Sequence, residues 1–241
     1  MSAPSWLLRI SLYRWARYRL QDVIDAVRRS RRRTAKLADA YLKANASAKL
    51  HIGCGDNPLP GWLNTEFDDR PPEGAIFMDA SRAFPLPGSR FDLVFSEHVI
   101  EHLPLSGARS MLEECFRVLK PGGRIRLCTP PLEFLAEMVL RPTPDHLRYA
   151  SYHYEMFSEE GSLKSPAGVL NDFHRLWGHQ FVYDAPSFQQ LLSDAGFVEI
   201  EQVALNESTT SELRDLENDR RMPDGMLALV TMCFEARKPA L

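Results

Sequence analysis

Short apolar runs recur along residues 49–236, and several of them end in glycine or in an acidic residue. Between the later runs lie stretches whose apolar residues have the spacing of a helix. This alternation predicts a doubly wound α/β fold, in which helices lie on both faces of a sheet. The predicted strands are 49–52, 62–66, 75–80, 91–98, 124–128, 197–205 and 226–236, and the predicted helices are 108–119, 132–140 and 187–192.

The first predicted strand leads into Gly53-Cys54-Gly55, and the second ends in Glu66. Because glycine has no Cβ, a glycine turn after a strand allows the backbone to come close to a ligand. A carboxylate at the end of the neighbouring strand can accept hydrogen bonds from both hydroxyls of a ribose. The pair predicts a nucleoside-bearing cofactor at the carboxyl edge of the sheet, with Asp68 as the rival of Glu66.

Further polar residues follow the next strands in order. Asp79 ends the third run, Ser96, Glu97 and His98 end the fourth, and Lys120-Pro121-Gly122-Gly123 forms a turn before the fifth. Parallel strands present their carboxyl ends at one edge, so these side chains are expected near the glycine turn. A dehydrogenase is the nearest enzyme alternative, but its Gly-x-Gly-x-x-Gly turn needs glycine at position 58, where this chain has proline.

In this order and spacing the motifs resemble the class I S-adenosylmethionine-dependent methyltransferases, over residues 47–237. The resemblance implies a Rossmann-like seven-stranded sheet whose last strand is antiparallel and inserted beside the fifth. It also implies S-adenosyl-L-methionine as the cofactor, with Asp79 and the N–H of Ala80 at adenine and Glu97 near the methionine ammonium. The implied cofactor-binding residues are Gly53, Cys54, Gly55, Glu66, Asp79, Ala80, Ser96 and Glu97.

Two positions depart from the family pattern. His51 stands where the family usually has an acid, and Asn57 replaces the third glycine of the loop. Asparagine tolerates left-handed backbone angles better than most residues, so the turn is expected to survive. The variant loop resembles a bacterial subgroup associated with polysaccharide and other sugar metabolism, which favours a sugar-like acceptor by analogy alone.

Residues 130–183 interrupt the alternation with a segment rich in histidine and aromatic residues, which predicts a substrate lid at the carboxyl edge. Methyl transfer to a hydroxyl needs a group that removes a proton, and histidine titrates in the right range. The candidate bases are His98, His174 and His179, whereas His102 is expected to pack beneath the site. The histidine spacings match no compact ligand pattern, so no metal is expected; a loosely held divalent ion that orients sugar hydroxyls stays an open alternative.

O-methylation of a saccharide or another small hydroxylated metabolite is therefore the favoured reaction. One alternative is a lipid-linked or lipophilic acceptor, and a second is a non-catalytic scaffold that keeps the fold and the cofactor. A non-catalytic scaffold is expected to have lost some of the acidic residues of the cofactor site. Here Glu66, Asp79 and Glu97 are all present.

Charge divides the chain into an extension, residues 1–47, and a methyltransferase domain, residues 48–241. Residues 1–38 carry ten lysines and arginines against two aspartates, a balance of +8 that leaves −11 for the rest, since the net charge is −3. The acidic domain argues against nucleic acid as a partner. The basic segment has an amphipathic helical pattern, which fits packing on the domain, a homodimer contact or a peripheral contact with the inner membrane.

The remaining composition points to the cytoplasm. The four cysteines, Cys54, Cys115, Cys128 and Cys233, show no Cys-x-x-Cys pairing, as expected of buried reduced thiols. Arginines interrupt the apolar residues near the start of the chain, which makes a poor signal peptide.

Overall fold

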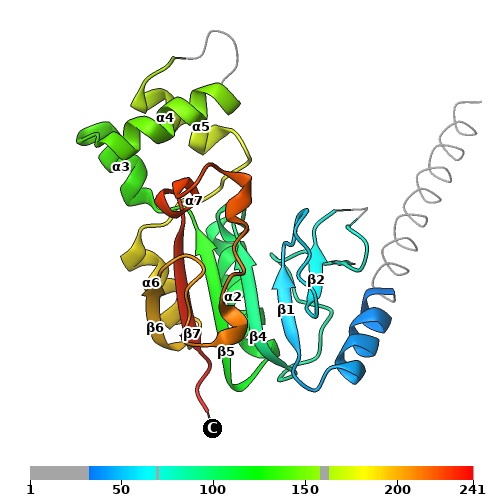
Figure 1. Ribbon diagram of the computed structural model, residues 1–241. Coiled ribbons are helices and arrows are strands. Elements are labelled where there is room, and N and C mark those ends of the chain that lie inside the picture. The colour runs from blue at the N-terminus through cyan, green and yellow to red at the C-terminus, as the bar shows by residue number, and fades with distance from the viewer. Residues whose placement is uncertain (1–32, 69–70, 158–162, 241) are drawn as a thin grey trace, which may run out of the picture.

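The computed structural model describes residues 33–68, 71–157 and 163–240, and these form one sheet with a helical cap (Figure 1). The strand order is β3-β2-β1-β4-β5-β7-β6. β7 lies antiparallel between β5 and β6, and the other neighbouring pairs are parallel, as the resemblance implied. The strands are β1 Lys49–Ile52, β2 Leu63–Glu66, β3 Ile76–Phe77, β4 Phe91–Glu97, β5 Leu119–Thr129, β6 Val198–Val203 and β7 Met232–Arg237.

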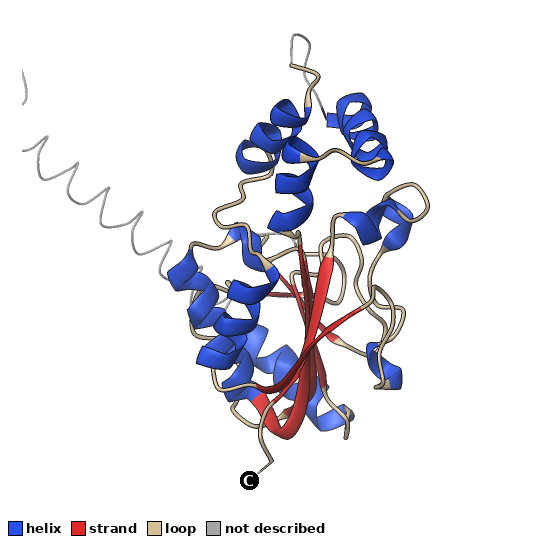
Figure 2. Ribbon diagram, turned by 90° about the vertical axis from the view of Figure 1, so that its left-hand side faces the viewer, coloured by secondary structure: helices blue, strands red, loops and turns tan. Residues whose placement is uncertain are grey.

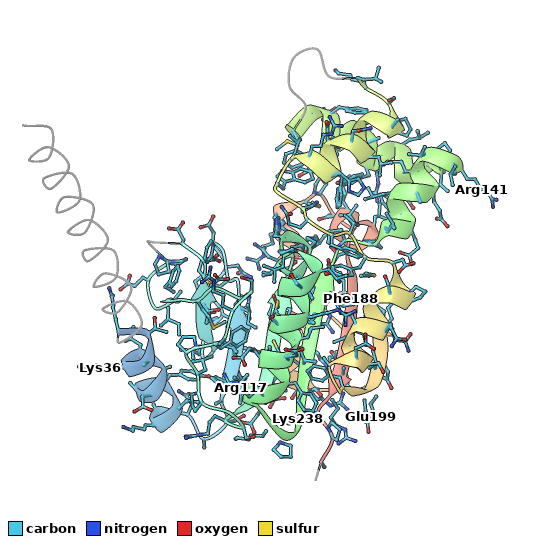
Figure 3. The ribbon with its side chains drawn as sticks, turned by 180° about the vertical axis from the view of Figure 1, so that it is seen from behind. Lys36, Arg117, Arg141, Phe188, Glu199 and Lys238 are labelled. Carbon is cyan, nitrogen blue, oxygen red and sulfur yellow. The ribbon has the colours of Figure 1, made fainter. Side chains whose placement is uncertain are left out.

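Helices cover one face of this sheet (Figure 2). Residues 33–44 form a helix, and α2 (Leu105–Val118) and α6 (Ala185–Asp194) join it in the largest apolar core. Asp184 caps α6 by accepting a hydrogen bond from Ser187 N. Figure 3 shows Phe188 on α6, whose ring centroid lies 5.5 Å from that of Phe234 in β7.

The opposite face carries only short helices in the described chain. In the described chain, the segment after β6 covers it, with the short helices η2 (Ser211–Leu213) and η3 (Asp219–Arg221). Leu213 and Leu216 pack there against Phe95 and Cys128. Two connections between strands contain no helix in their described residues: β1–β2 (53–62) and β2–β3 (67–75). Both begin at the carboxyl edge as turns and loops.

The predicted lid is a small helical cap above the carboxyl edge (Figure 1). It consists of α3 (Leu132–Leu140), α4 (Pro144–Phe157) and α5 (Pro166–Arg175). The cap has its own apolar core, in which Tyr149 and Phe173 pack with Met226 of α7 (Met226–Leu229). One predicted element begins differently: residues 226–229, expected to start the last strand, form α7 because Met226 and Leu229 pack into the cap core before β7 begins.

The amphipathic pattern predicted for residues 1–38 falls largely outside the described residues. Where the structure describes this part of the chain, residues 33–44, the helix buries Thr34, Ala38 and Leu42 against the domain. Among the described helices, none combines the length and apolar character that a membrane crossing requires.

Candidate functional site

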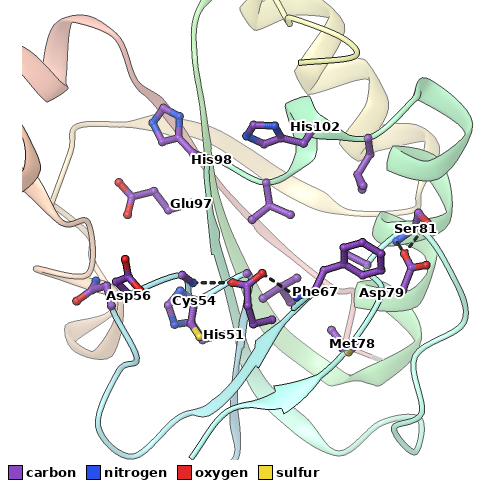
Figure 4. Close-up of a pocket in the computed structure, with 18 of the residues that line it drawn as sticks. His51, Cys54, Asp56, Phe67, Met78, Asp79, Ser81, Glu97, His98 and His102 are labelled. Carbon is purple, nitrogen blue, oxygen red and sulfur yellow. Dashed lines mark hydrogen bonds between the residues drawn. The ribbon is translucent and has the colours of Figure 1, made fainter. Parts of the chain in front are cut away.

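A cavity of about 760 Å³ opens at the carboxyl ends of β1, β2 and β4 (Figure 4). It is lined by the glycine turn after β1, by residues after β2 and β3, and by the end of β4. Residues of the segment between β6 and β7 close one side. Most sequence-predicted cofactor residues meet here, namely Gly53, Cys54, Gly55, Glu66, Asp79, Ala80 and Glu97.

The glycine turn has the geometry that only glycine adopts easily. Gly53 and Gly55 have φ values of +67° and +48°. A Cβ on Gly53 would lie 2.2 Å from Cγ2 of Val99, so this position has no room for a side chain. Asn57 does not use left-handed angles; its N–H instead closes the turn onto the carbonyl of Cys54 at 2.9 Å. The departure from glycine at position 57 therefore carries no strain.

Glu66 reaches from the end of β2 to the glycine turn. Its Oε2 accepts a hydrogen bond from Gly55 N and its Oε1 one from Phe67 N, both at 2.7 Å. A carboxylate has about four acceptor positions, so two remain for a ligand. Glu66 rather than the rival Asp68 lines the cavity, and the side chain of Phe67 lies exposed beside it.

Asp79 is held by its own loop after β3. Its Oδ1 accepts hydrogen bonds from Ser81 N at 3.0 Å and from Ser81 Oγ at 2.6 Å, and its Oδ2 lies 2.9 Å from Nε of Arg82. These contacts fix the carboxylate at the cavity wall before any ligand arrives (Figure 4). Preorganisation of this kind lowers the entropy cost of binding.

The end of β4 sends neighbouring residues in different directions. Ser96 is buried and donates to the carbonyl of Ile52, so its hydroxyl joins two strands instead of lining the cavity. Glu97 lines the cavity, where its Oε1 accepts a hydrogen bond from Nη2 of Arg221 at 2.6 Å. Burial raises the pKa of Glu97, and Arg221 acts in the opposite direction.

His98 has unusual surroundings for a histidine at a cavity. Its backbone is left-handed, with φ of +53°, a strained conformation that concentrates at functional sites. Its Nδ1 lies 3.0 Å from Oε1 of the fully buried Glu101, and its Nε2 lies 2.9 Å from Oγ1 of Thr231. Burial is the largest influence on Glu101 and opposes its ionisation, but the contacts with His98 and its own backbone N–H outweigh it and lower the pKa.

The other predicted bases lie apart from one another. His174 is exposed on α5 and does not line the cavity. His179, in the loop after α5, lies with its ring centroid 4.8 Å from that of His102, which does line the cavity. His146 and His153 bind Thr143 and Asp172 within the cap. The lid histidines are thus mostly part of the cap structure.

His51, one of the two departures from the family pattern that the sequence resembles, is buried beside the glycine turn. Its Nδ1 lies 3.0 Å from Oδ1 of Asn64, which also accepts from Leu59 N. The amide nitrogen of Asn64 donates to Leu59 O and Trp62 O, so Oδ1 faces the histidine and His51 donates through Nδ1. Burial lowers the pKa of His51 to about 4, which keeps the ring neutral at pH 7.

This buried histidine makes stability depend on pH. The unfolded chain binds a proton at His51 near pH 6.5, but the folded chain does so only near pH 4, so stability falls as the pH drops between these values. The contribution of His51 should decrease by about 3 kcal/mol between pH 7 and pH 4. Urea unfolding of the wild type and of His51→Gln between pH 7 and pH 4 tests this. The difference between their free energies of unfolding should shrink as the pH falls. Parallel stability curves would contradict the assignment.

Several cavity residues had no clear signal in the sequence. Arg221 belongs to η3 and Asn218 directly precedes it, both far along the chain, and Phe67 follows β2 directly. Thr231, which contacts His98 but does not line the cavity, precedes β7. Only Phe67 lies close to a recognised motif, so a search for aromatic residues next to the acid of β2 could have found it. The remaining three depend on how the segment after β6 folds back.

Comparisons with known proteins gave a match to a protein family over part of the chain. A family model described as a methyltransferase domain matches residues 63–127, from β2 into β5. A search of curated proteins found no match.

Many solved structures are similar to this chain, and the following three are among them. One is a SAM-dependent methyltransferase from Thermotoga maritima, named as a possible histamine N-methyltransferase (17% identity, TM-score 0.48, 91% of this chain and 97% of that chain). Another is a SAM-dependent methyltransferase from Archaeoglobus fulgidus (15%, 0.45, 85% and 94%). The third is the phosphoethanolamine N-methyltransferase 2 of Haemonchus contortus with S-adenosyl-L-methionine (14%, 0.44, 83% and 51%). All three TM-scores are below 0.5, so we draw nothing about the acceptor from them.

Proposed function

We propose that this protein, a class I S-adenosylmethionine-dependent methyltransferase, methylates a hydroxyl group of a saccharide or another small hydroxylated metabolite. The methyltransferase-domain match and the sheet order carry the identification of the enzyme and its cofactor. One observation carries the hydroxyl acceptor: His98, at the cavity, has the buried carboxylate of Glu101 3.0 Å from its Nδ1.

The cofactor map follows from the groups that line the cavity. Gly53 and Gly55 allow the cofactor to approach the backbone, and Glu66 has acceptor positions left for the ribose hydroxyls. Asp79 and the N–H of Ala80 are assigned to the adenine. At the methionine end, Arg221 adds a positive charge beside Glu97, so this pair fits a zwitterion with one carboxylate and one ammonium group.

Calorimetry with S-adenosylhomocysteine tests this map. Asp79→Ala and Glu66→Ala should each weaken binding by about 1.5–3 kcal/mol, because each removes a charged acceptor and leaves its donor unpaired. Asp68→Ala is the matched control, because Asp68 is an acid two residues from Glu66 that does not line the cavity. The affinity of this variant for S-adenosylhomocysteine should equal that of the wild type. Unchanged affinity in both cavity variants would overturn the map, and a preference for NAD would favour a dehydrogenase.

His98 and Glu101 form the proposed proton-accepting pair. When bound, the cofactor supplies a methyl group already activated on a sulfonium sulfur. With Nδ1 directed at Glu101, the lone pair of His98 lies on Nε2, where the hydroxyl of Thr231 now donates. An acceptor hydroxyl in the place of Thr231 would give its proton to Nε2 while its oxygen took up the methyl group that the cofactor would supply. Glu101 then stabilises the imidazolium.

The loop after α5 supports a sugar-like acceptor. Its residues Gln180 and Phe181 donate their N–H groups to the carbonyl of Glu101, at 2.7 and 3.2 Å. Trp177 and Phe181 lie on the same short loop as His179; both are partly exposed, and the Trp177 ring also packs against Phe173. Exposed aromatic rings can stack on the apolar faces of sugar rings.

Methyl transfer by the full-length protein to a panel of soluble saccharides, amines and lipid extracts tests the proposal. Transfer to a saccharide hydroxyl is the expected result, and His98→Gln should lower kcat by about 10²–10⁴-fold. Its affinity for S-adenosylhomocysteine should stay unchanged, which separates lost chemistry from lost binding.

Three results would count against this acceptor. Transfer to amines alone would overturn the hydroxyl acceptor and the role of His98 together. Transfer to lipid extracts alone would instead favour the lipophilic acceptor and a role for the basic N-terminal segment at the membrane. An unchanged kcat in His98→Gln would remove His98 as the base.

A further inference from the structure

We propose that Glu101, His102 and His179 form a binding site for a divalent transition-metal cation. Each residue offers one ligand atom, and the three ligand atoms all lie within 4.8 Å of one another. Glu101 and His102 belong to η1 (Ile100–His102), and His179 comes from the loop that joins the cap to the sheet. Two imidazoles and a carboxylate are a ligand set that holds first-row divalent metals and leaves positions open for other ligands.

His179 is prepared to act as a ligand. Its Nδ1 lies 2.7 Å from the carbonyl oxygen of Phe173, so Nδ1 carries the proton and the lone pair lies on Nε2. Metal-binding histidines usually have such a partner on the second ring nitrogen, because it fixes the ring and its tautomer.

Glu101 supplies an unusual buried charge. Its side chain has no exposed surface, and no aligned hydrogen bond is donated to Oε1, although Nδ1 of His98 lies 3.0 Å away. Oε2 accepts one hydrogen bond, from Thr129 Oγ1 at 3.1 Å. A buried carboxylate with so few donors costs free energy unless a positive charge is nearby. A cation between Glu101 and the two histidines would supply that charge.

The backbone holds the three ligands in place without a metal. The N–H groups of Gln180 and Phe181 donate to the carbonyl of Glu101, which ties the loop of His179 to η1. His102 follows Glu101 directly and its side chain lines the cavity (Figure 4). A cation held there would therefore lie in the cavity wall, open to a bound acceptor.

A second group of potential ligands, Cys128, Glu217 and Cys233, does not support a metal site. Arg126 donates to both carboxylate oxygens of Glu217, at 2.5 and 3.1 Å, so that charge is already neutralised. Burial also raises the pKa of the Cys128 thiol, which disfavours the thiolate that a metal needs.

The role of the cation rests on the proposed function. A divalent cation in the cavity wall can bind two neighbouring hydroxyl oxygens of an acceptor and thereby orient it. It also lowers the pKa of a bound hydroxyl, which eases the transfer of its proton to His98. Neighbouring hydroxyls are characteristic of saccharides, so the site would favour them over simple alcohols.

Titration of the full-length protein with Zn²⁺, Mn²⁺ and Co²⁺, after chelator treatment and without cofactor or acceptor, tests the site by calorimetry. One equivalent should bind, and the melting temperature should rise with it. His102→Gln and His179→Gln should each lower the affinity at least about tenfold, because each removes one of three protein ligands. His174→Gln, an exposed histidine outside the cluster, should leave the affinity unchanged.

No saturable binding of any of the three cations would overturn the metal site, and so would binding that His102→Gln and His179→Gln leave intact. In either case Glu101 belongs to a metal-free cluster in which it contacts His98 and accepts a hydrogen bond from Thr129. Because this measurement needs no methyl acceptor, its outcome is independent of the acceptor panel: a cation can bind where no hydroxyl is methylated, and a hydroxyl can be methylated without a cation.

Discussion

Replacing Arg126 by methionine should lower the free energy of unfolding by about 3–5 kcal/mol, the largest single loss expected in the sheet. The guanidinium group is fully buried in β5 and binds two buried carboxylates, Glu217 and Glu235. It also donates to the carbonyls of Ala204 and Glu207, which holds the segment after β6 against the sheet. Methionine fills a similar volume but leaves both carboxylates without their cation. Urea denaturation at pH 7 measures the loss.

Arg124→Met is the matched control for this experiment. Arg124 belongs to the same strand, but it is partly exposed and lies 3.8 Å from Glu199 and 3.9 Å from Glu235. Long ion pairs formed by a partly exposed side chain contribute about 1 kcal/mol or less. If Arg126→Met and Arg124→Met lose similar amounts of unfolding free energy, the buried ion pairs of Arg126 do not stabilise the sheet as predicted. If Arg126→Met does not fold, Arg126→Lys, which keeps the charge but loses the bidentate geometry, should give an intermediate loss.

The strands of the carboxyl edge could be predicted because each carries its own local signal. Gly53 and Gly55 directly follow an apolar run, and Glu66 and Asp79 each stand at the end of another apolar run. The local sequence alone therefore predicts all four at the carboxyl edge of the sheet. The structure brings these four residues to one cavity. The antiparallel β7 was different, since only the resemblance to a family implied it.

What escaped prediction depends on contacts between distant parts of the chain. Arg124 and Arg126 alternate with Ile125, a pattern typical of a strand with one solvent-exposed side, yet Arg126 is buried because Glu217 and Glu235 come from elsewhere in the sequence. Glu101 shows the same difficulty. In the sequence it is one acid in a short polar helix, and only the fold encloses it between His98 and Thr129.

The cap illustrates a further limit of local pattern. Histidines and aromatic residues in residues 130–183 suggested a lid with side chains directed at the substrate. In the structure His153 contacts Asp172, and Tyr149 packs in the cap core, so most of these residues stabilise the cap itself. A small helical cap needs aromatic residues for its own core as well as for contacts with a substrate. Composition alone cannot tell which residues serve the core and which contact the substrate.

Gly53→Ala should weaken the binding of S-adenosylhomocysteine by about 30-fold or more, the largest single effect expected on the cofactor site. The left-handed φ of +67° costs a residue with a Cβ about 1–2 kcal/mol, and the clash with Val99 adds about 1–3 kcal/mol. The turn can relieve this strain only by moving away from Val99, which displaces the backbone that faces the cofactor. Calorimetry measures the affinity and thermal unfolding reports the strain.

Gly61→Ala separates the two causes. Gly61 has a similar φ of +77°, but a Cβ added there would meet nothing within 4 Å among the described residues, and Gly61 does not line the cavity. This variant should lose about 1–2 kcal/mol of stability and keep its cofactor affinity. In the double variant Gly53→Ala, Val99→Ala the clashing Cγ2 is gone, so part of the affinity should return. An affinity in Gly53→Ala equal to that of the wild type would mean that the cofactor does not approach the glycine turn.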